Sequence, residues 1–205
     1  MRRLLKVSAA VAIMVCFAFA LPNRTEKFEV VIDAGHGGKD YGSAYGDFTE
    51  KQINEIISKK VKNHIENKDV EVHFTRLNDE FIDLSDRVEM INRIKPDLVL
   101  SLHTNFTSKE NNNASGIEIF VGKNSIAKDK SIAHAKALAN SMKGYKFYSK
   151  ETKEASFYVL NKVESPAILL EMGFLSNEGD RTYLTDEAGQ DKLAQTIASF
   201  INDIK

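Results

Sequence analysis

The 205-residue sequence has little cysteine and no strong excess of either charge. Its single cysteine, Cys16, lies within the first twenty residues, so a chain cleaved after residue 20 has no disulfide framework and no thiolate metal site. Any metal ion must then be bound by histidine or carboxylate side chains. The sequence also lacks a basic stripe and an interleaving of aromatic with basic residues, so we expect no nucleic-acid partner.

The first twenty residues have the layout of a secretory signal peptide. Three cations precede an apolar run over residues 7–21, and the sequence Ala-Phe-Ala at residues 18–20 fits a small-x-small cleavage site. The run is shorter than the ~20 residues of a comfortable membrane span, although an uncleaved anchor is the alternative. We expect a signal peptide over residues 1–20, a short lead over residues 21–27, export to the periplasm or cell envelope of a bacterium, and no stable membrane insertion after cleavage.

The remaining sequence has the pattern of one globular domain. Apolar residues make up 42% of the sequence and charged residues 28%. Strand and helix patterns alternate along residues 28–205, which predicts a single α/β domain with helices on both faces of a mostly parallel twisted sheet. The predicted strands cover residues 28–33, 70–75, 97–102, 117–121, 157–160 and 167–170. The predicted helices cover residues 84–94, 125–142, 187–204 and a segment from an N-cap at Thr49, in a capping box with Gln52, to about residue 67.

Three polar residues follow predicted strands at their carboxyl ends, where open α/β sheets bind ligands, and a fourth lies at the start of the first long helix. His36 follows the first strand within Ala34-Gly35-His36-Gly37-Gly38, His103 follows the third strand, and Glu171 follows the last. Glu50 stands in the first turn of the first long helix, where a carboxylate also suits the helix dipole. Two histidines and a carboxylate are a common ligand set of catalytic zinc sites, and a second carboxylate can take a proton from water.

Each of these residues also has a purely structural interpretation. A histidine at a strand end can be a hydrogen-bonded loop residue, Glu50 a partner of the helix dipole, and Glu171 the partner of an arginine. The pattern alone leaves these interpretations open. It contains no His-Glu-x-x-His helix, which excludes a thermolysin-like zinc protease. The other histidines, at positions 64, 73 and 134, are expected to lie outside any metal site.

These residues resemble the zinc-dependent N-acetylmuramoyl-L-alanine amidases of type 3, cell-wall hydrolases with one compact α/β catalytic domain. The resemblance spans residues 28–205 and rests on separated blocks that occur in the family's order. The blocks are residues 31–42, Glu50-Lys51, Thr75-Arg76 with Leu84 and Arg87, 97–105, 116–118 and 166–177.

The resemblance implies that His36, Glu50 and His103 bind one zinc ion and that Glu171 is the catalytic carboxylate. The implied fold is a three-layer domain of the phosphorylase/hydrolase kind. The implied substrate is peptidoglycan, cut at the amide between N-acetylmuramic acid and L-alanine of the stem peptide. We expect a monomer, leave an activating partner open, and expect the glycines around His36 to keep the loop low enough for a bulky substrate.

The sequence departs from the family pattern directly after the strand predicted over residues 157–160. Asn161 occupies a position where many members have an arginine near the cleft, so the contact with substrate is expected to differ. The segment between Phe120 and Phe157 is too short to add the autoinhibitory helix of some members to an ordinary helix, so no such helix is expected.

Two other functions compete with this interpretation. A zinc peptidase that trims cell-wall peptides would need a cation for the terminal carboxylate, and Arg76, Arg87 and Arg93 are available. A catalytically inactive peptidoglycan-binding protein would usually lack a ligand or the general base, whereas all four candidates are present here.

Overall fold

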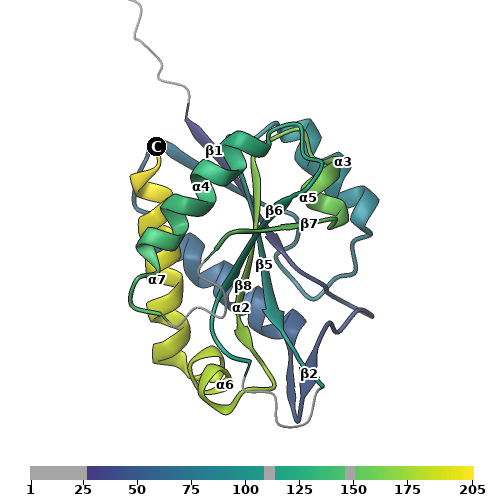
Figure 1. The fold of residues 1–205 in the computed structure, drawn as a ribbon, viewed down its shortest axis with the longest axis vertical. Coiled ribbons are helices and arrows are strands. Elements are labelled where there is room, and N and C mark those ends of the chain that lie inside the picture. Colours follow the sequence, from purple (N-terminus) through teal and green to yellow (C-terminus); the bar gives the residue numbers. More distant parts are fainter. Residues whose placement is uncertain (1–26, 109–113, 146–150) are drawn as a thin grey trace, which may run out of the picture.

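A six-stranded sheet forms the centre of the molecule (Figure 1). The computed structural model describes residues 27–108, 114–145 and 151–205, so the predicted signal peptide lies outside the described residues. The strand order is β4-β1-β5-β8-β6-β7. Strands β4, β1, β5 and β8 are parallel, β6 is antiparallel to β8, and β7 is parallel to β6. The strands are β1 (Phe28–Ala34), β4 (Val70–Phe74), β5 (Leu98–Asn105), β6 (Glu118–Gly122), β7 (Lys153–Ala155) and β8 (Ala167–Phe174).

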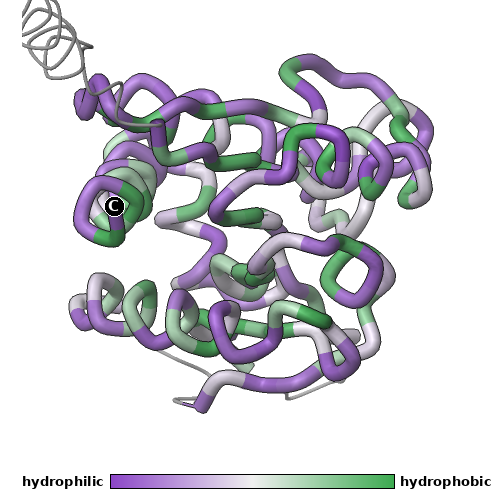
Figure 2. Tube along the Cα trace, turned by 90° about the horizontal axis from the view of Figure 1, so that it is seen from above, coloured by the Kyte–Doolittle hydropathy of each residue, from purple (hydrophilic) through white to green (hydrophobic). Residues whose placement is uncertain are grey.

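Helices cover both faces of this sheet, which confirms the predicted α/β class. One face packs against α2 (Glu50–His64), α4 (Lys128–Ser141) and α7 (Glu187–Asp203), and the other against α3 (Leu84–Ile94) and α5 (Tyr158–Lys162). Alternate residues of a strand point to opposite faces, so Val30 and Ile32 join the first core and Val31 joins the second. Seen from above, hydrophobic and hydrophilic residues alternate along the helices and strands (Figure 2).

The strand predicted over residues 157–160 is wrong. These residues enter the short helix α5, and the neighbouring strand is β7 instead. A four-residue apolar run fits a strand and a buried helical turn equally well, so periodicity could not decide between them. The helical turn is held by the Asn161 side chain, which donates hydrogen bonds to the carbonyls of Ala155 and Phe157.

Other boundaries also differ from the sequence prediction. Helix α2 ends at His64, and its N-cap Thr49 bonds the side chain of Gln52 rather than a backbone N–H, so the capping box is not formed as predicted. Besides β7, three further elements were missed: the strands β2 (Ala44–Tyr45) and β3 (Phe48–Thr49), which form a hairpin, and helix α6 (Glu178–Thr185). Within the described residues, no helix combines the length and apolar character of a membrane span.

Strands β5 and β8 extend further than predicted, so His103 and Glu171 lie inside strands rather than after them. The two residues are direct partners across the β5–β8 pair, and the register shifts between His103 and Asn105. Such an irregularity bends a strand locally and re-aims its side chains. The carboxyl edge of the sheet therefore presents both residues at one place.

Candidate functional site

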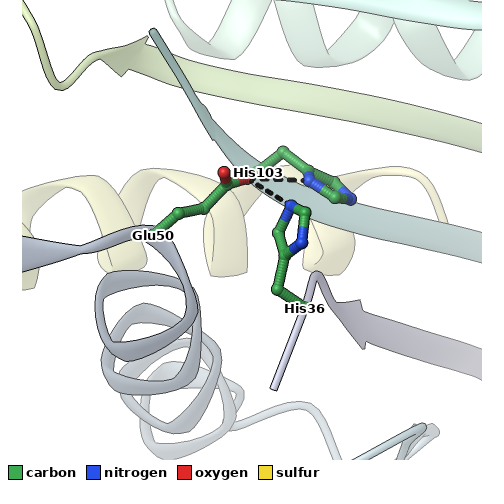
Figure 3. A group of neighbouring side chains, drawn as sticks. All are labelled: His36, Glu50 and His103. Atoms are coloured by element: carbon green, nitrogen blue, oxygen red, sulfur yellow. Dashed lines mark hydrogen bonds and ion pairs between the residues drawn. The ribbon is translucent and has the colours of Figure 1, made fainter. Parts of the chain in front are cut away.

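The structure brings His36, Glu50 and His103 together at the carboxyl edge of the sheet (Figure 3). His36 comes from the loop after β1, Glu50 from the first turn of α2, and His103 from β5. One carboxylate oxygen, Oε1 of Glu50, lies 3.1 Å from Nε2 of His36 and 2.9 Å from Nδ1 of His103. One ligand atom from each residue lies within 4.8 Å of the others, so these three residues can hold a metal ion.

Two of the three side chains, those of His36 and Glu50, are held by further partners. Nδ1 of His36 lies 2.8 Å from a carboxylate oxygen of Asp40, which leaves Nε2 directed toward Glu50. The Glu50 carboxylate accepts hydrogen bonds from the backbone N–H groups of Ser43 and Thr104, at 2.8 and 3.1 Å. Such supporting contacts fix the orientation and tautomer of metal-binding residues.

Two glycines are required by the close approach of the site's own side chains. A Cβ atom on Gly35 would lie 2.3 Å from Cε1 of His103, and one on Gly42 would lie 2.5 Å from Oε2 of Glu50. Neither distance is sterically tolerable without movement of the neighbour. These glycines therefore make room for His103 and Glu50. For Gly35 this role adds to the expected one, which is to keep the loop low for the substrate.

The backbone of His36 is in the left-handed region, with φ at 62°. This conformation costs a non-glycine residue roughly 1–2 kcal/mol, so the surrounding structure must hold it. Two buried arginines do so. Arg87 donates to the carbonyls of Ala34 and His36 at 2.8 and 2.7 Å, and Arg76 donates to those of Ala34 and Gly35 at 3.0 Å each.

These arginine contacts also bear on the peptidase alternative. Arg87 is paired with Asp33 at 2.6 Å, and Arg76 contacts Glu55 at 3.2 Å and the carbonyl of Lys51 at 2.9 Å. Arg93 is on the exposed side of α3, where it pairs with Glu89. Arg76 and Arg87 thus bind internal acceptors, and the sequence analysis did not foresee this positioning role, although it had singled out both residues as part of a family block.

Glu171 stands next to His103 on β8 with its carboxylate largely buried. Its Oε2 atom has no hydrogen-bond partner among the described residues. Burial raises the pKa of this carboxyl group to about 7; His103 acts against that rise, and the carboxylates of Glu50 and Glu118 add to it. A buried carboxylate with a spare oxygen and a pKa near neutrality is suited to accept and return a proton.

Glu118 is a further carboxylate of the site that the sequence analysis did not assign. It is buried on β6 directly opposite Glu171. Its side chain accepts a hydrogen bond from Asn105 at 2.9 Å and is paired with Lys153. The only sequence signal for Glu118 was its place in the family block of residues 116–118. That block did not predict that Glu118 would influence the pKa of Glu171.

The charges of the three clustered residues fit a bound cation. Burial raises the pKa of Glu50, but hydrogen bonds from His103 and His36 outweigh it and lower that pKa. Burial lowers the pKa of His36, but the carboxylates of Glu50 and Asp40 raise it to about 9, and Glu50 likewise raises that of His103. Without a metal, the two ring nitrogens that face Glu50 are protonated and donate hydrogen bonds to its carboxylate. A divalent cation that binds the same atoms displaces those protons.

A cavity of about 470 Å³ opens beside the cluster on the side of α3 and α5. His36, His103 and Glu171 line it, whereas Glu50 does not. The cavity therefore reaches the two histidine ligand candidates and the unpartnered carboxylate from one side. Its walls are mostly apolar side chains of the segment before α3 and of α5.

The other histidines lie away from this cluster. His64 pairs with Asp191. His73 pairs with Glu29 and, together with Glu71, forms a second group whose ligand atoms lie within 4.8 Å of one another and could hold a metal ion, so the expectation that His73 lies outside any metal site is not confirmed. Asn161, the departure from the family pattern, accepts a hydrogen bond from the backbone N–H of Asn124 at 2.6 Å and anchors α5. Its side chain is used to hold the helix that lines the cavity.

Comparison with known proteins places this fold and site in a family. The sequence profile described as N-acetylmuramoyl-L-alanine amidase matches residues 30–203. The chain is 31% identical over 178 residues to the protein YqiI of Bacillus subtilis (strain 168), with 84% of this chain and 82% of YqiI covered. It is 32% identical over 181 residues to the endolysin of Bacillus phage SPP1, where it covers 65% of the relative and 85% of itself.

Solved structures agree with this result. The N-acetylmuramoyl-L-alanine amidase from Clostridium difficile 630 superposes with a TM-score of 0.80 at 31% identity, over 87% of this chain and 97% of that chain. The CwlD amidase from Clostridioides difficile, in complex with the GerS lipoprotein, superposes with a TM-score of 0.77 at 28% identity, over 86% and 98% of the two chains. The chain therefore belongs to the N-acetylmuramoyl-L-alanine amidase family.

Proposed function

We propose that this protein hydrolyses the amide bond between N-acetylmuramic acid and L-alanine in peptidoglycan. One zinc ion would be held by His36, Glu50 and His103, and Glu171 would be the catalytic carboxylate. The observation that carries the proposal is the convergence of these three side chains beside a buried carboxylate oxygen that has no partner among the described residues.

The donor set fits zinc. Two imidazole nitrogens and one carboxylate oxygen are ligands typical of a catalytic zinc site, in which three protein ligands leave a position for water. When bound, zinc supplies Lewis-acid polarisation of the amide carbonyl and lowers the pKa of its water. Asp40 supports this use of His36 because its carboxylate holds the other ring nitrogen, at 2.8 Å.

Glu171 supplies the proton transfer in this proposal. Its carboxylate accepts a proton from the attacking water and returns it to the alanine nitrogen that leaves. Burial serves both halves of this cycle because a pKa near neutrality allows the same group to take up and release the proton. His103 lowers the pKa of Glu171 and Glu118 raises it, so the two neighbours have opposite effects on its protonation.

We also propose that residues 1–20 direct export, that residues 21–27 form a short lead, and that residues 28–205 form the catalytic domain. This assignment rests on the apolar run near the start of the sequence, and it places the enzyme in the cell envelope, where its substrate is found. A single chain holds all four site residues, which is consistent with action as a monomer. The CwlD amidase is found in complex with the GerS lipoprotein, and on this ground we propose that a partner protein binds this chain too.

The test is to incubate the purified protein with peptidoglycan and identify the products by mass spectrometry, with and without a chelator. We expect free stem peptides that begin with L-alanine, and we expect the chelator to abolish and added zinc to restore their release. Products trimmed only at the peptide C-terminus would support the peptidase instead. Binding without any product would support the inactive binding protein.

Zinc content gives a second, independent measurement. We expect one zinc ion per chain by elemental analysis, and its loss in His36→Ala and His103→Ala variants. His64→Ala is the matched control, because His64 pairs with Asp191 away from the cluster. Retention of a full zinc equivalent by both site variants would contradict the proposed ligand set.

A further inference from the structure

The cavity beside the cluster has two apolar walls that remain open to solvent. The α3 wall consists of Phe81 and Leu84, and the α5 wall consists of Phe157 and Tyr158. These four side chains are between 40% and 52% exposed. Large apolar side chains gathered around one cavity are typical of a ligand-binding surface, because single exposed ones are common but a group of them is not.

Both walls are held in place by neighbouring contacts. The ring of Phe157 meets that of Phe120 edge-on, with centroids 5.4 Å apart, and Lys39 lies 4.2 Å from the ring centroid of Phe81. Asn161 anchors the helix that carries Phe157 and Tyr158 through its bonds to Ala155 and Phe157. The walls are thus preorganised, which lowers the cost of binding a rigid ligand.

The charges around the cavity oppose an anionic ligand. Asp40 and Asp83 line it together with Glu171. Among the described residues that line it, Arg87 is the one arginine, and it is buried and donates hydrogen bonds to Asp33 and to backbone carbonyls. Away from the proposed metal site at His36 and His103, a carboxylate in this cavity would therefore meet acidic side chains, and Arg87 is not directed toward it. The fitting ligand is bulky and uncharged.

The position of the cavity limits what can occupy it. His36, His103 and Glu171 line one end, so the occupant must be joined closely to the amide that reacts. On the peptide side of that amide stands the small methyl group of alanine, followed by residues that bear carboxylates. On the glycan side stands the muramic ring, whose only carboxyl group is consumed in the amide.

We infer that this cavity binds the muramic sugar ring, so that the glycan side of the scissile amide lies between α3 and α5 and the stem peptide leaves in another direction. The inference rests on the proposed function and adds the orientation of the substrate to it. Aromatic faces attract the C–H face of a pyranose because the ring face carries negative charge density. A volume of about 470 Å³ lies in the range of small-ligand sites.

The experiment compares two soluble substrates that share the same peptide. One is the N-acetylmuramoyl peptide, and the other is the lactoyl peptide that lacks the sugar ring. The variants are Phe157→Ala and Tyr158→Ala, with Phe157→Leu to separate the loss of a flat ring from the loss of apolar bulk. Ile126→Ala is the control, because Ile126 is an exposed apolar residue outside the cavity lining.

We expect each alanine variant to lose about tenfold in kcat/KM on the muramoyl peptide, mainly through a higher KM, and to keep the wild-type value on the lactoyl peptide. Phe157→Leu should fall between wild type and Phe157→Ala. Equal losses on both substrates would overturn the inference, as would losses that grow with the length of the peptide, because the stem would then occupy the cavity. Unchanged kinetics in both variants would overturn it too.

A binding measurement tests the same inference where a variant or a substrate gives no measurable hydrolysis. Saturation-transfer NMR with free N-acetylmuramic acid derivatised as its amide should show contact of the sugar protons with wild-type protein and a weaker signal with Phe157→Ala. An equal signal in both proteins would contradict the inference. If wild-type protein binds this sugar but hydrolyses neither peptide, the proposed function fails and the sugar site stands.

Discussion

Asp33 and Glu171 are both buried carboxylates on the central sheet, yet their surroundings differ in kind. Asp33 accepts hydrogen bonds from Arg87, Thr75 and Ser101, at 2.6 to 2.8 Å. Burial raises its pKa, but these partners outweigh burial and lower it. Glu171 has a carboxylate oxygen without a partner among the described residues, and its pKa is raised to about 7.

The difference shows that partners, rather than burial, decide what a carboxylate at this edge can do. Asp33 is a permanent anion that neutralises Arg87, and through Arg87 it supports the loop of His36. Glu171 can change its protonation state because nothing in its described surroundings holds either form exclusively. Asp33 contributes to rigid support, and Glu171 would contribute the chemistry in the function proposed above.

The sharpest test of this contrast is Glu171→Gln. We expect kcat to fall by about 10²- to 10⁴-fold, the usual contribution of a general base, while zinc content stays at the wild-type level. The stability of the protein should not decrease, because the substitution removes a buried charge that lacks a partner. Peptidoglycan turnover and thermal unfolding measure the two effects, and near-normal turnover would remove Glu171 from its assigned role.

Asp33→Asn should have the opposite profile. The substitution leaves the buried guanidinium of Arg87 without its charge partner, which costs roughly 3–5 kcal/mol in the free energy of unfolding. Urea denaturation measures this loss. We expect the zinc-saturated folded variant to retain turnover within about tenfold of wild type. Loss of turnover in Asp33→Asn without loss of stability would contradict the structural role assigned to Asp33.

The pH dependence of stability should separate the two carboxylates in metal-free protein. Asp33 has a lowered pKa, so its stabilisation is present above its unfolded value near 3.8 and is lost as the pH falls through the folded value. Glu171 has a raised pKa, so its folded form holds a proton that the unfolded chain releases above 4.5. Stability therefore declines from about pH 4.5 to about 7 by an amount on the order of 3 kcal/mol.

Urea denaturation of wild type and Glu171→Gln across this pH range, with a chelator present, measures the contribution of Glu171. The difference in the free energy of unfolding between the two proteins should change between pH 4.5 and 7 and stay constant above pH 7. A difference that is constant with pH would show that Glu171 titrates normally. Because Glu171 also raises the pKa of His103, we expect the variant to titrate this histidine at a lower pH than wild type.

Arg76→Lys is expected to have the smallest of these effects. The lysine keeps the positive charge but cannot make all the hydrogen bonds of the guanidinium group. Arg76 donates these bonds to the carbonyls of Ala34, Gly35 and Lys51, and Lys51 is the neighbour of Glu50 in the sequence. Zinc affinity should fall by about 10- to 100-fold, measured by competition with a chromophoric chelator. Arg93→Lys is the matched control on the exposed side of α3, and an equal affinity in both variants would limit Arg76 to a general structural role.

The sequence alone predicted much of the fold because the long elements have strong periodicity. Helix α3 was predicted at its observed bounds, and β1 and α7 were predicted within a residue at each end. The segment before Asn161 was assigned wrongly because a short apolar run has no decisive period. Its helical state depends on contacts with Ala155 and Phe157 that form only in the folded chain.

The candidate site divides in the same way. The residue types and their places near strand ends singled out His36, Glu50, His103 and Glu171 as candidates, and the family resemblance supplied the roles expected of them. The sequence did not reveal how the surroundings of Asp33 and Glu171 differ, since each is one acidic residue on an apolar strand. Only the tertiary structure set Arg87 and Ser101, 54 and 68 positions away along the chain, against Asp33 and left an oxygen of Glu171 unpartnered among the described residues. Protonation depends on such neighbours, and the folded chain alone chooses them.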